Sequence, residues 1–281
     1  MHGLSQNQTV AGNRCALAAM GTLPPFCPRS ERRAEATAAM LAKCRIRGTR
    51  HFMNTPDLIA LAIFLVLWMG YSWITDRAKL FDRVSLTRAM SSQRAVWIRN
   101  AMHRDLRMID TQIMAGLQNG TAFFASTSLL ALGSCFALLG ATEQVFAIFN
   151  DLPYFFHGSR AGFETKVGGL AIIFGYAFFK FGWSYRLFNY CTILLGAMPM
   201  SGDIHKDPAG ADLAADKVIR MNILAAKHFN KGLRAIFLSI GYLGWFVSPF
   251  LFIATTVGII IVLVRRQFYS EARLAVLERL D

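Results

Sequence analysis

The sequence has few charged residues for its length, and acidic residues are fewer than basic ones. Only 17% of its 281 residues are charged, whereas a soluble domain usually has about a quarter. Hydrophobic residues make up 54% of the chain, and its mean hydropathy is +0.37. They are grouped in long blocks rather than spread evenly. This pattern argues against a soluble domain and predicts an all-α integral membrane protein.

Motifs of catalysis and nucleotide binding are absent as well. The chain has no nucleophile elbow, Walker loop, dinucleotide-binding glycine fingerprint or HExxH motif. Its cysteines are Cys15, Cys27, Cys44, Cys135 and Cys191. None forms a CxxC pair, so neither a disulfide framework nor a zinc site is expected. Residues 203–207 have the spacing Asp-x-His-x-Asp, which we interpret as a solvated loop because no second ligand cluster accompanies it. We expect no catalytic residue, no metal and no cofactor.

Basic residues are abundant, with 30 Lys and Arg against 17 Asp and Glu, a net charge of +13. Nucleic-acid binding is one reading of such an excess, but no nucleic-acid motif accompanies it. The basic residues lie between the apolar blocks instead. Their placement indicates membrane topology and contact with anionic lipid headgroups, and we expect no nucleic-acid partner.

Residues 1–52 differ from the rest. They contain eight Lys or Arg and two Glu, and no sustained apolar periodicity. Thr55, Pro56 and Asp57 then suit a helix start, as a cap, a first helical residue and an acid at the positive helix end. We interpret 1–52 as a disordered basic extension, either an upstream translation of a protein that starts at Met53 or an Arg-rich targeting peptide.

Four apolar blocks predict four transmembrane helices within a membrane domain over residues 53–266: 58–74, 121–141, 166–200 and 236–264. The third would be about 50 Å long against roughly 30 Å of hydrocarbon, so its second half should emerge from the membrane. The fourth contains Ser248-Pro249 and is expected to kink there. Residues 267–281 form a short amphipathic tail.

An amphipathic helix is predicted between the first two membrane helices, on the cytoplasmic side. Its apolar positions recur every three or four residues: Ile98, Met102, Leu106, Ile109, Ile113 and Leu117. Such a helix packs on the membrane surface or on its own bundle, or binds a partner protein. A further polar helix is expected over residues 212–234.

Small residues recur at intervals of seven in two membrane helices. The positions are Ser126, Gly133 and Gly140, then Gly168, Gly175, Gly182, Asn189 and Gly196. Small residues let helix backbones approach closely in lipid, so these seams favour a homo-oligomer.

Basic loops mark the cytoplasmic side of a membrane. Loop 75–120 has eight Lys or Arg and loop 201–234 has six, whereas loop 142–165 has one. Loops 75–120 and 201–234 are therefore expected in the cytoplasm of a bacterial inner (plasma) membrane. Four crossings place both ends outside, which conflicts with Arg265-Arg266 at the end of the fourth helix.

Two charges fall at membrane depth, Lys180 and Arg186. One interpretation is anchoring to lipid phosphate, or pairing with Asp110. The other is a cationic site for an anionic ligand. The candidate ligand- or headgroup-binding residues are Arg99, Arg107, Asp110, Lys180, Arg186 and Asn189.

Several blocks resemble a known family. Residues 109–114 (IDTQIM), 123–127 (FFAST) and 179–190 (FKFGWSYRLFNY) are similar to family 599 of the domains of unknown function, a bacterial membrane family with plant members. Residues 230–235 (NKGLRA) resemble a further block that comes late in the sequence of that family. The resemblance leaves 1–52 outside. It implies a multi-pass membrane protein without an established activity, so no catalytic assignment carries over to this chain.

Three functions are open at this point. The first is a non-enzymatic, lipid-contacting or scaffolding component of the membrane. The second is a small transporter or channel for an anionic solute that uses Lys180. The third is a membrane enzyme acting on lipid headgroups, for which no acid–base pair is evident.

Overall fold

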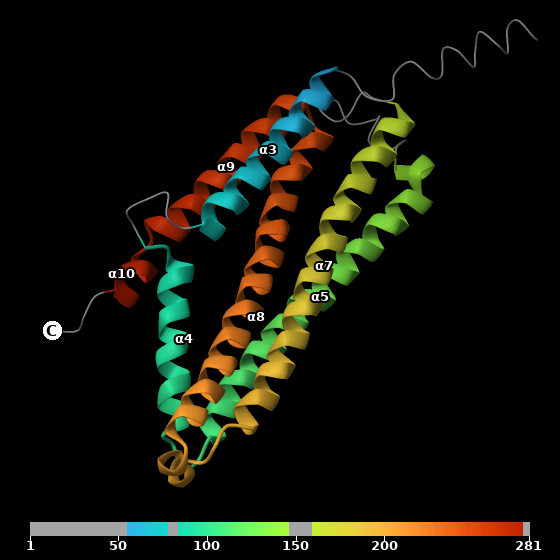
Figure 1. Cartoon of the computed structure of the whole chain (residues 1–281). Helices are drawn as coiled ribbons and strands as arrows, with labels where there is room; N and C mark the ends of the chain where they lie inside the picture. The colour runs from blue at the N-terminus through green and yellow to red at the C-terminus, as the bar shows by residue number, and fades with distance from the viewer. Residues whose placement is uncertain (1–54, 78–83, 146–158, 278–281) are drawn as a thin grey trace, which may run out of the picture. The chain divides into compact units, whose positions relative to one another are not determined.

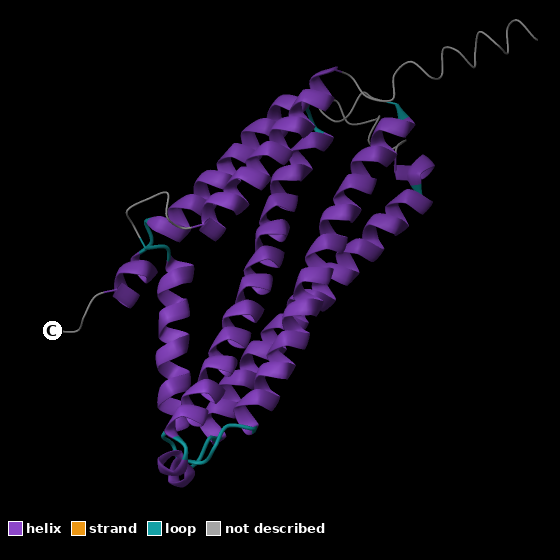
Figure 2. Ribbon diagram, viewed as in Figure 1, coloured by secondary structure: helices purple, strands orange, loops and turns teal. Residues whose placement is uncertain are grey.

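The computed structural model describes residues 55–77, 84–145 and 159–277, and every regular element in these ranges is helical (Figures 1 and 2). The elements are α3 (Thr55–Arg77), α4 (Leu86–Met102), α5 (Met108–Gly140), α7 (Arg160–Gly196), η1 (Ser201–Lys206), α8 (Pro208–Leu243), η2 (Gly244–Phe246), α9 (Pro249–Phe268) and α10 (Glu271–Leu277). The predicted all-α fold is confirmed. The interpretation of residues 1–52 lies outside the described residues.

Side-chain caps explain where four of the helices begin. Ser85, Ser159, Asp207 and Ser248 precede α4, α7, α8 and α9, and each accepts a hydrogen bond from the backbone N–H three residues later. Such caps satisfy N–H groups that have no partner inside the helix. Pro208 and Pro249 follow two of these caps at positions where a missing N–H costs nothing.

Four helices are long and apolar enough to cross a membrane: Thr55–Thr75, Met108–Gly140, Arg160–Gly196 and Pro249–Leu277. Large apolar side chains on all four point outward, and Val66, Leu130, Ile172 and Phe250 are each at least 70% exposed. Soluble proteins rarely expose apolar surface on this scale. The outward faces of these helices are therefore suited to lipid.

The last predicted membrane helix, 236–264, is wrong as a single kinked helix. α8 ends at Leu243, and α9 runs back beside it from Pro249, so the two form a tight hairpin (Figure 1). The hydroxyl of Thr255 on α9 donates to the carbonyl of Gly241 on α8 at 2.7 Å. A Cβ at Gly241 would lie 3.2 Å from the Thr256 backbone, so a glycine lets the helices come this close. Ser248-Pro249 caps a new helix instead of kinking an old one.

The helices pack in a chain of neighbours: α5 on α7, α7 on α8, and α8 on both α4 and α9, while α3 packs on α9. This arrangement buries two apolar cores. The first core includes Phe64, Phe181, Leu238 and Phe252, and it joins α3, α5, α7, α8 and α9. The second core includes Ile98 and Leu195, and it joins α4, α5, α7, α8 and η1. Three helices, α5, α7 and α8, thus belong to both cores.

Helix lengths separate the two cores. At 1.5 Å per residue, α3 and α9 with 23 and 20 residues are about 35 and 30 Å long. α5, α7 and α8 with 33, 37 and 36 residues reach about 50–55 Å. The first core therefore has the depth of a bilayer, and the second occupies about the remaining 20 Å of the long helices. The predicted unbroken third helix is present as α7.

The predicted apolar face over residues 98–117 is wrong as one helix. α4 ends at Met102, and α5 begins at Met108. Ile98 and Met102 are buried in the second core, whereas Leu106 and Ile109 are 76% and 66% exposed. The chain turns between the helices, and the turn ends the periodicity. A helix between the first two membrane helices is present as α4.

The glycines at intervals of seven do not pack against any other described part of the chain. A Cβ at Gly133, Gly168, Gly175 or Gly182 would meet nothing within 4 Å. The close contact between α7 and α8 uses Gly232 instead, where a Cβ would lie 2.7 Å from the Phe181 ring. Assembly of a homo-oligomer through the seams stays a prediction.

Candidate functional site

Three of the predicted site residues lie around the turn between α4 and α5. Arg99 forms an exposed ion pair with Asp216 at 3.3 Å. The guanidinium of Arg107 donates to the carbonyls of Ala101 in α4 (3.2 Å), Leu195 in the last turn of α7 (3.3 Å) and Met198 just after it (2.9 Å), and so joins the ends of α4 and α7. These contacts give Arg99 and Arg107 structural partners within the chain.

Asp110 is fully buried, and its partners are on α4 and in the turn after it. One carboxylate oxygen accepts hydrogen bonds from Arg104 at 2.5 Å and from the Trp97 indole at 2.7 Å. The expected pairing of Asp110 with Lys180 or Arg186 is therefore wrong.

Lys180 and Arg186 each contact an aromatic residue of their own helix. The Lys180 ammonium lies 5.1 Å from the centre of the Tyr176 ring, and Arg186 Nε donates to the Tyr190 hydroxyl at 2.7 Å. Asn189 is half-buried on the same helix. None of the six predicted residues lines the main cavity of the described chain, which lies between α4, α5, α8 and α9. The structure does not bring them together in one site, and headgroup binding by them stays a prediction.

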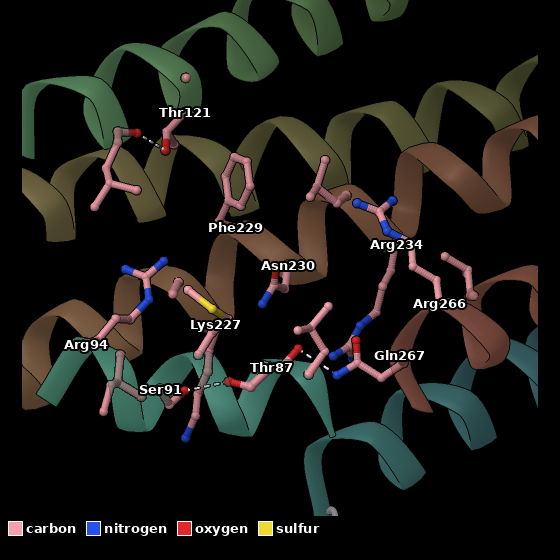
Figure 3. A pocket seen from close by; sticks show the side chains of 18 of the residues that line it. Thr87, Ser91, Arg94, Thr121, Lys227, Phe229, Asn230, Arg234, Arg266 and Gln267 are labelled. Atoms are coloured by element: carbon pink, nitrogen blue, oxygen red, sulfur yellow. Dashed lines mark hydrogen bonds between the residues drawn. The ribbon is translucent and has the colours of Figure 1, made fainter. Parts of the chain in front are cut away.

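A cavity of about 330 Å³ lies where the two cores meet. One wall is a face of α8, the second is α5, and the third is formed by the end of α3, the start of α4 and the end of α9 (Figure 3). The cavity exists because α3 and α9 end at this level and α4 begins there. Gly116 and Gly120 widen it on the α5 side, since a Cβ at either position would meet nothing within 4 Å.

Four cations line this cavity: Arg94, Lys227, Arg234 and Arg266. No Asp or Glu lines it among the residues that the structure describes. Figure 3 shows Arg94 and Lys227 toward one end and Arg234 and Arg266 toward the other, with Asn230 between them. A cavity with this lining favours an anion.

The local contacts of the cations leave room for a ligand. The Arg94 guanidinium donates to the buried amide oxygen of Asn222 at 2.5 Å, and burial lowers the pKa of Arg94 from its ordinary value. Arg266 lies 5.8 Å from the centre of the Phe237 ring. Lys227 forms no ion pair or hydrogen bond with another described residue. These three cations therefore have neutral partners or none within the described part of the chain.

The rest of the lining is mixed. Gln267 donates to the Thr87 hydroxyl at 2.7 Å, which ties α9 to α4, and the Asn230 amide faces the cavity between the cations (Figure 3). Apolar side chains complete the wall: Phe229, Leu233, Phe237 and Leu263. The cavity is thus amphiphilic, with donors of hydrogen bonds beside an apolar surface.

Sequence reasoning missed this cavity, although two spacings point to it. Thr87, Ser91 and Arg94 are four and three residues apart, so they share a face of α4. Lys227, Asn230 and Arg234 share a face of α8 in the same way. Neither spacing reveals that the two faces meet, because the cavity draws its walls from helices far apart in sequence.

A second polar cluster lies in the first core, at its other end. The Lys166 ammonium lies 3.6 Å from the Asp57 carboxylate and donates to the Trp245 carbonyl at 2.9 Å. The Trp245 indole donates to Asp57 at 2.6 Å, and the Tyr242 hydroxyl donates to the Lys166 carbonyl at 3.0 Å. The cluster connects α3, α7, α8 and η2. The sequence predicts Lys166 at the edge of a membrane helix, whereas the structure buries its charge.

Metal binding has no support in the described residues, where no three His, Cys, Asp or Glu side chains gather. In the predicted loop 203–207, Asp203 pairs with Lys206 at 2.6 Å and Asp207 caps α8. Cys135 and Cys191 are both free and buried.

Comparison with known proteins places this arrangement in a family. A family model described as "Protein of unknown function, DUF599" matches residues 59–272. The chain belongs to this family. The DUF599 match confirms the resemblance seen in the sequence, and it includes every described residue that lines the cavity. No curated protein and no solved structure matches the chain.

Proposed function

We propose that this DUF599 protein is a non-enzymatic, multi-pass component of a bacterial inner membrane that acts through contact with anionic lipids. The observation that supports this is a group of cations on α7, α8 and α9, which we call the cationic belt: Lys180, Lys227, Lys231, Arg265 and Arg266. Lys227 and Arg266 line the same cavity, which puts these residues of α8 and α9 at one level. The Trp183 ring on α7 lies 6.4 Å from the His228 ring on α8, and each is three residues from a belt lysine, Lys180 or Lys231, which puts these α7 and α8 residues at the same height.

The belt coincides with the ends of the short helices. Arg265 and Arg266 lie in the last turn of α9. Lys180 lies about 21 Å along α7 from Lys166, whose cluster is at the opposite end of the first core. Basic residues on the cytoplasmic side attract anionic headgroups, each by about 1 kcal/mol. The belt therefore suits the inner headgroup layer.

The hairpin of α8 and α9 changes the topology that the sequence predicts. α8 accompanies α7 along its length, so we take α8 as a fifth crossing beside α3, α5, α7 and α9. Five crossings put the end of α9 on the same side as loops 75–120 and 201–234. The conflict posed by Arg265-Arg266 then disappears, because all basic segments in the described part face the cytoplasm.

A reporter fused after Asp281 tests this topology. We expect it to read cytoplasmic, and a second reporter inserted in loop 142–165 to read external. An external reading after Asp281 would contradict five crossings and favour four. It would also place the end of α9, with its belt residues, away from the cytoplasmic headgroups.

Lipid contact is tested by the lipids that remain bound after purification. The protein is reconstituted in equal amounts of phosphatidylglycerol and phosphatidylcholine, extracted in mild detergent, and its phospholipids are quantified. We expect enrichment of phosphatidylglycerol in the wild type and less in the triple variant Lys180→Gln, Lys231→Gln, Arg265→Gln. Equal retention of the two lipids by the wild type would contradict the proposal.

Transport of an anionic solute is the competing function, and flux measurements separate it. We expect wild-type liposomes to show no anion flux above that of empty ones. Flux that is present in the wild type and lost in Lys180→Ala and Arg186→Ala would replace our proposal by transport.

A further inference from the structure

We propose that the cavity between α4, α5, α8 and α9 is a binding site for the phosphate group of an anionic lipid headgroup. This inference rests on the proposed function and gives the lipid contact a defined place. It goes beyond the belt, because it assigns saturable binding to Arg94, Lys227 and Arg266, which line one cavity.

The charge of the lining selects the ligand class. Arg94 and Arg266 have neutral contacts, an amide oxygen at 2.5 Å and an aromatic ring at 5.8 Å, and Lys227 has no partner among the described residues. Cations grouped without a carboxylate among the described residues repel one another unless an anion binds between them. Guanidinium groups present several N–H donors that match phosphate oxygens. The neutral donors of Asn230 and Gln267 add hydrogen bonds beside them.

The position of the cavity favours a lipid over a soluble phosphate. Its lining includes Tyr71, one turn before the end of the apolar part of α3, and Leu263, Arg266 and Gln267 at the end of α9. In the proposed orientation this is the inner headgroup layer. Phe229, Leu233 and Phe237 form an apolar wall next to the cations, as the start of an acyl chain requires.

The size of the cavity limits what enters it. About 330 Å³ is at the lower end of the range for small-molecule pockets, which suits a phosphate-bearing headgroup rather than a whole phospholipid. Gly120 offers a way to close the cavity without removing any charge. Because its Cβ position meets nothing within 4 Å, Gly120→Leu puts a side chain into the open space, and it also removes a helix-interior glycine.

The experiment measures the rise in unfolding temperature of the full chain in neutral detergent as short-chain lipids are added, since a ligand of the folded state stabilises it in a saturable way. The probes are short-chain phosphatidylglycerol, short-chain phosphatidylcholine, glycerol phosphate and inorganic phosphate. The cavity variant is Arg94→Gln, Lys227→Gln, Arg266→Gln. The matched control removes three exposed cations that lie outside both the cavity and the belt: Lys206→Gln, Lys217→Gln, Arg220→Gln.

We expect saturable stabilisation of the wild type by phosphatidylglycerol, and affinity at least tenfold lower in the cavity variant. The control should stay within about threefold of the wild type. Gly120→Leu should lose affinity as the cavity variant does while its own unfolding temperature does not fall, so poor folding of the triple variant does not decide the outcome.

Each contrary result has a distinct meaning. Unchanged affinity in both Gly120→Leu and the cavity variant overturns this inference, and the proposed function survives if the wild type still prefers phosphatidylglycerol. No preference of the wild type for phosphatidylglycerol overturns both. Equal affinity for glycerol phosphate or inorganic phosphate overturns the lipid as the source and assigns the site to a soluble phosphate.

Discussion

The buried pair of Lys166 and Asp57 is expected to hold the first core together at one end. Its side chains are 5% and 14% exposed, and Trp245 bonds to both partners. Removing one member of a buried ion pair strands the other charge, which typically costs about 3–5 kcal/mol. We therefore expect Asp57→Asn to lower the free energy of unfolding by about 3 kcal/mol, because it strands the more deeply buried ammonium.

A double-mutant cycle isolates the pair. Lys166→Met should cost somewhat less than Asp57→Asn, since the carboxylate that it leaves is nearer the surface and keeps the Trp245 hydrogen bond. The double variant should be more stable than the sum of the single effects predicts, by about 2 kcal/mol. Denaturant titration of the purified protein in mixed micelles provides the four free energies.

Arg160 supplies the matched control at the same end of α7. It pairs with Glu143 and Glu164, but its side chain is 56% exposed. Exposed pairs contribute little, so Arg160→Gln should leave the unfolding midpoint almost unchanged. If Lys166→Met and Asp57→Asn proved as mild as Arg160→Gln, the argument that this cluster joins α3, α7 and η2 would be refuted.

Three further variants test the packing and the turn. Gly232→Leu should destabilise the protein by about 1–3 kcal/mol in thermal unfolding, because its Cβ meets the Phe181 ring at 2.7 Å, whereas Gly175→Ala should be neutral. Arg107→Gln should raise amide hydrogen exchange at the ends of α4 and α7, whose carbonyls it binds, and exchange in α9 should not change. Asp110→Asn should cost about 2 kcal/mol of stability, because Arg104 and Trp97 lose a charged acceptor in a buried site; a loss below that of Arg99→Gln, which breaks an exposed pair, would contradict this.

The sequence predicted the membrane helices best where apolar residues are uninterrupted. α3, α5 and α7 contain most of the blocks 58–74, 121–141 and 166–200, because crossing a bilayer needs a long apolar run. α5 begins at Met108, 13 residues before its predicted block. The family resemblance was also right. Both conclusions depend on local composition, which one sequence reveals.

The hairpin of α8 and α9 was missed although its signals are local. Ser248-Pro249 has the same cap-and-proline form as Thr55-Pro56, which predicts a helix start. At Ser248 the apolar residues continue on both sides, so hydropathy favoured one kinked helix. Gly241 and Gly244 are the sequence signal for the hairpin, since two helices that reverse direction this closely need small residues where they touch.

Charges were harder to interpret than apolar residues. Lys180 and Arg186 stood out in sequence, yet they contact their own helix, whereas the charge at Lys166 is buried against Asp57 more than a hundred residues away. The cavity depends in the same way on α4, α5, α8 and α9 meeting. Such contacts follow from tertiary packing, which spacing along one helix does not encode.

The three long helices have a mechanical consequence. α5, α7 and α8 run without interruption through both cores, so neither end can tilt alone. Rotating such a rod by about 10° around the junction displaces a tip roughly 20 Å away by about 3–4 Å. The cavity lies where the two cores meet, at the point around which the long helices would rotate. Filling or emptying it would therefore act where a small change in helix angle gives the largest movement of the far end.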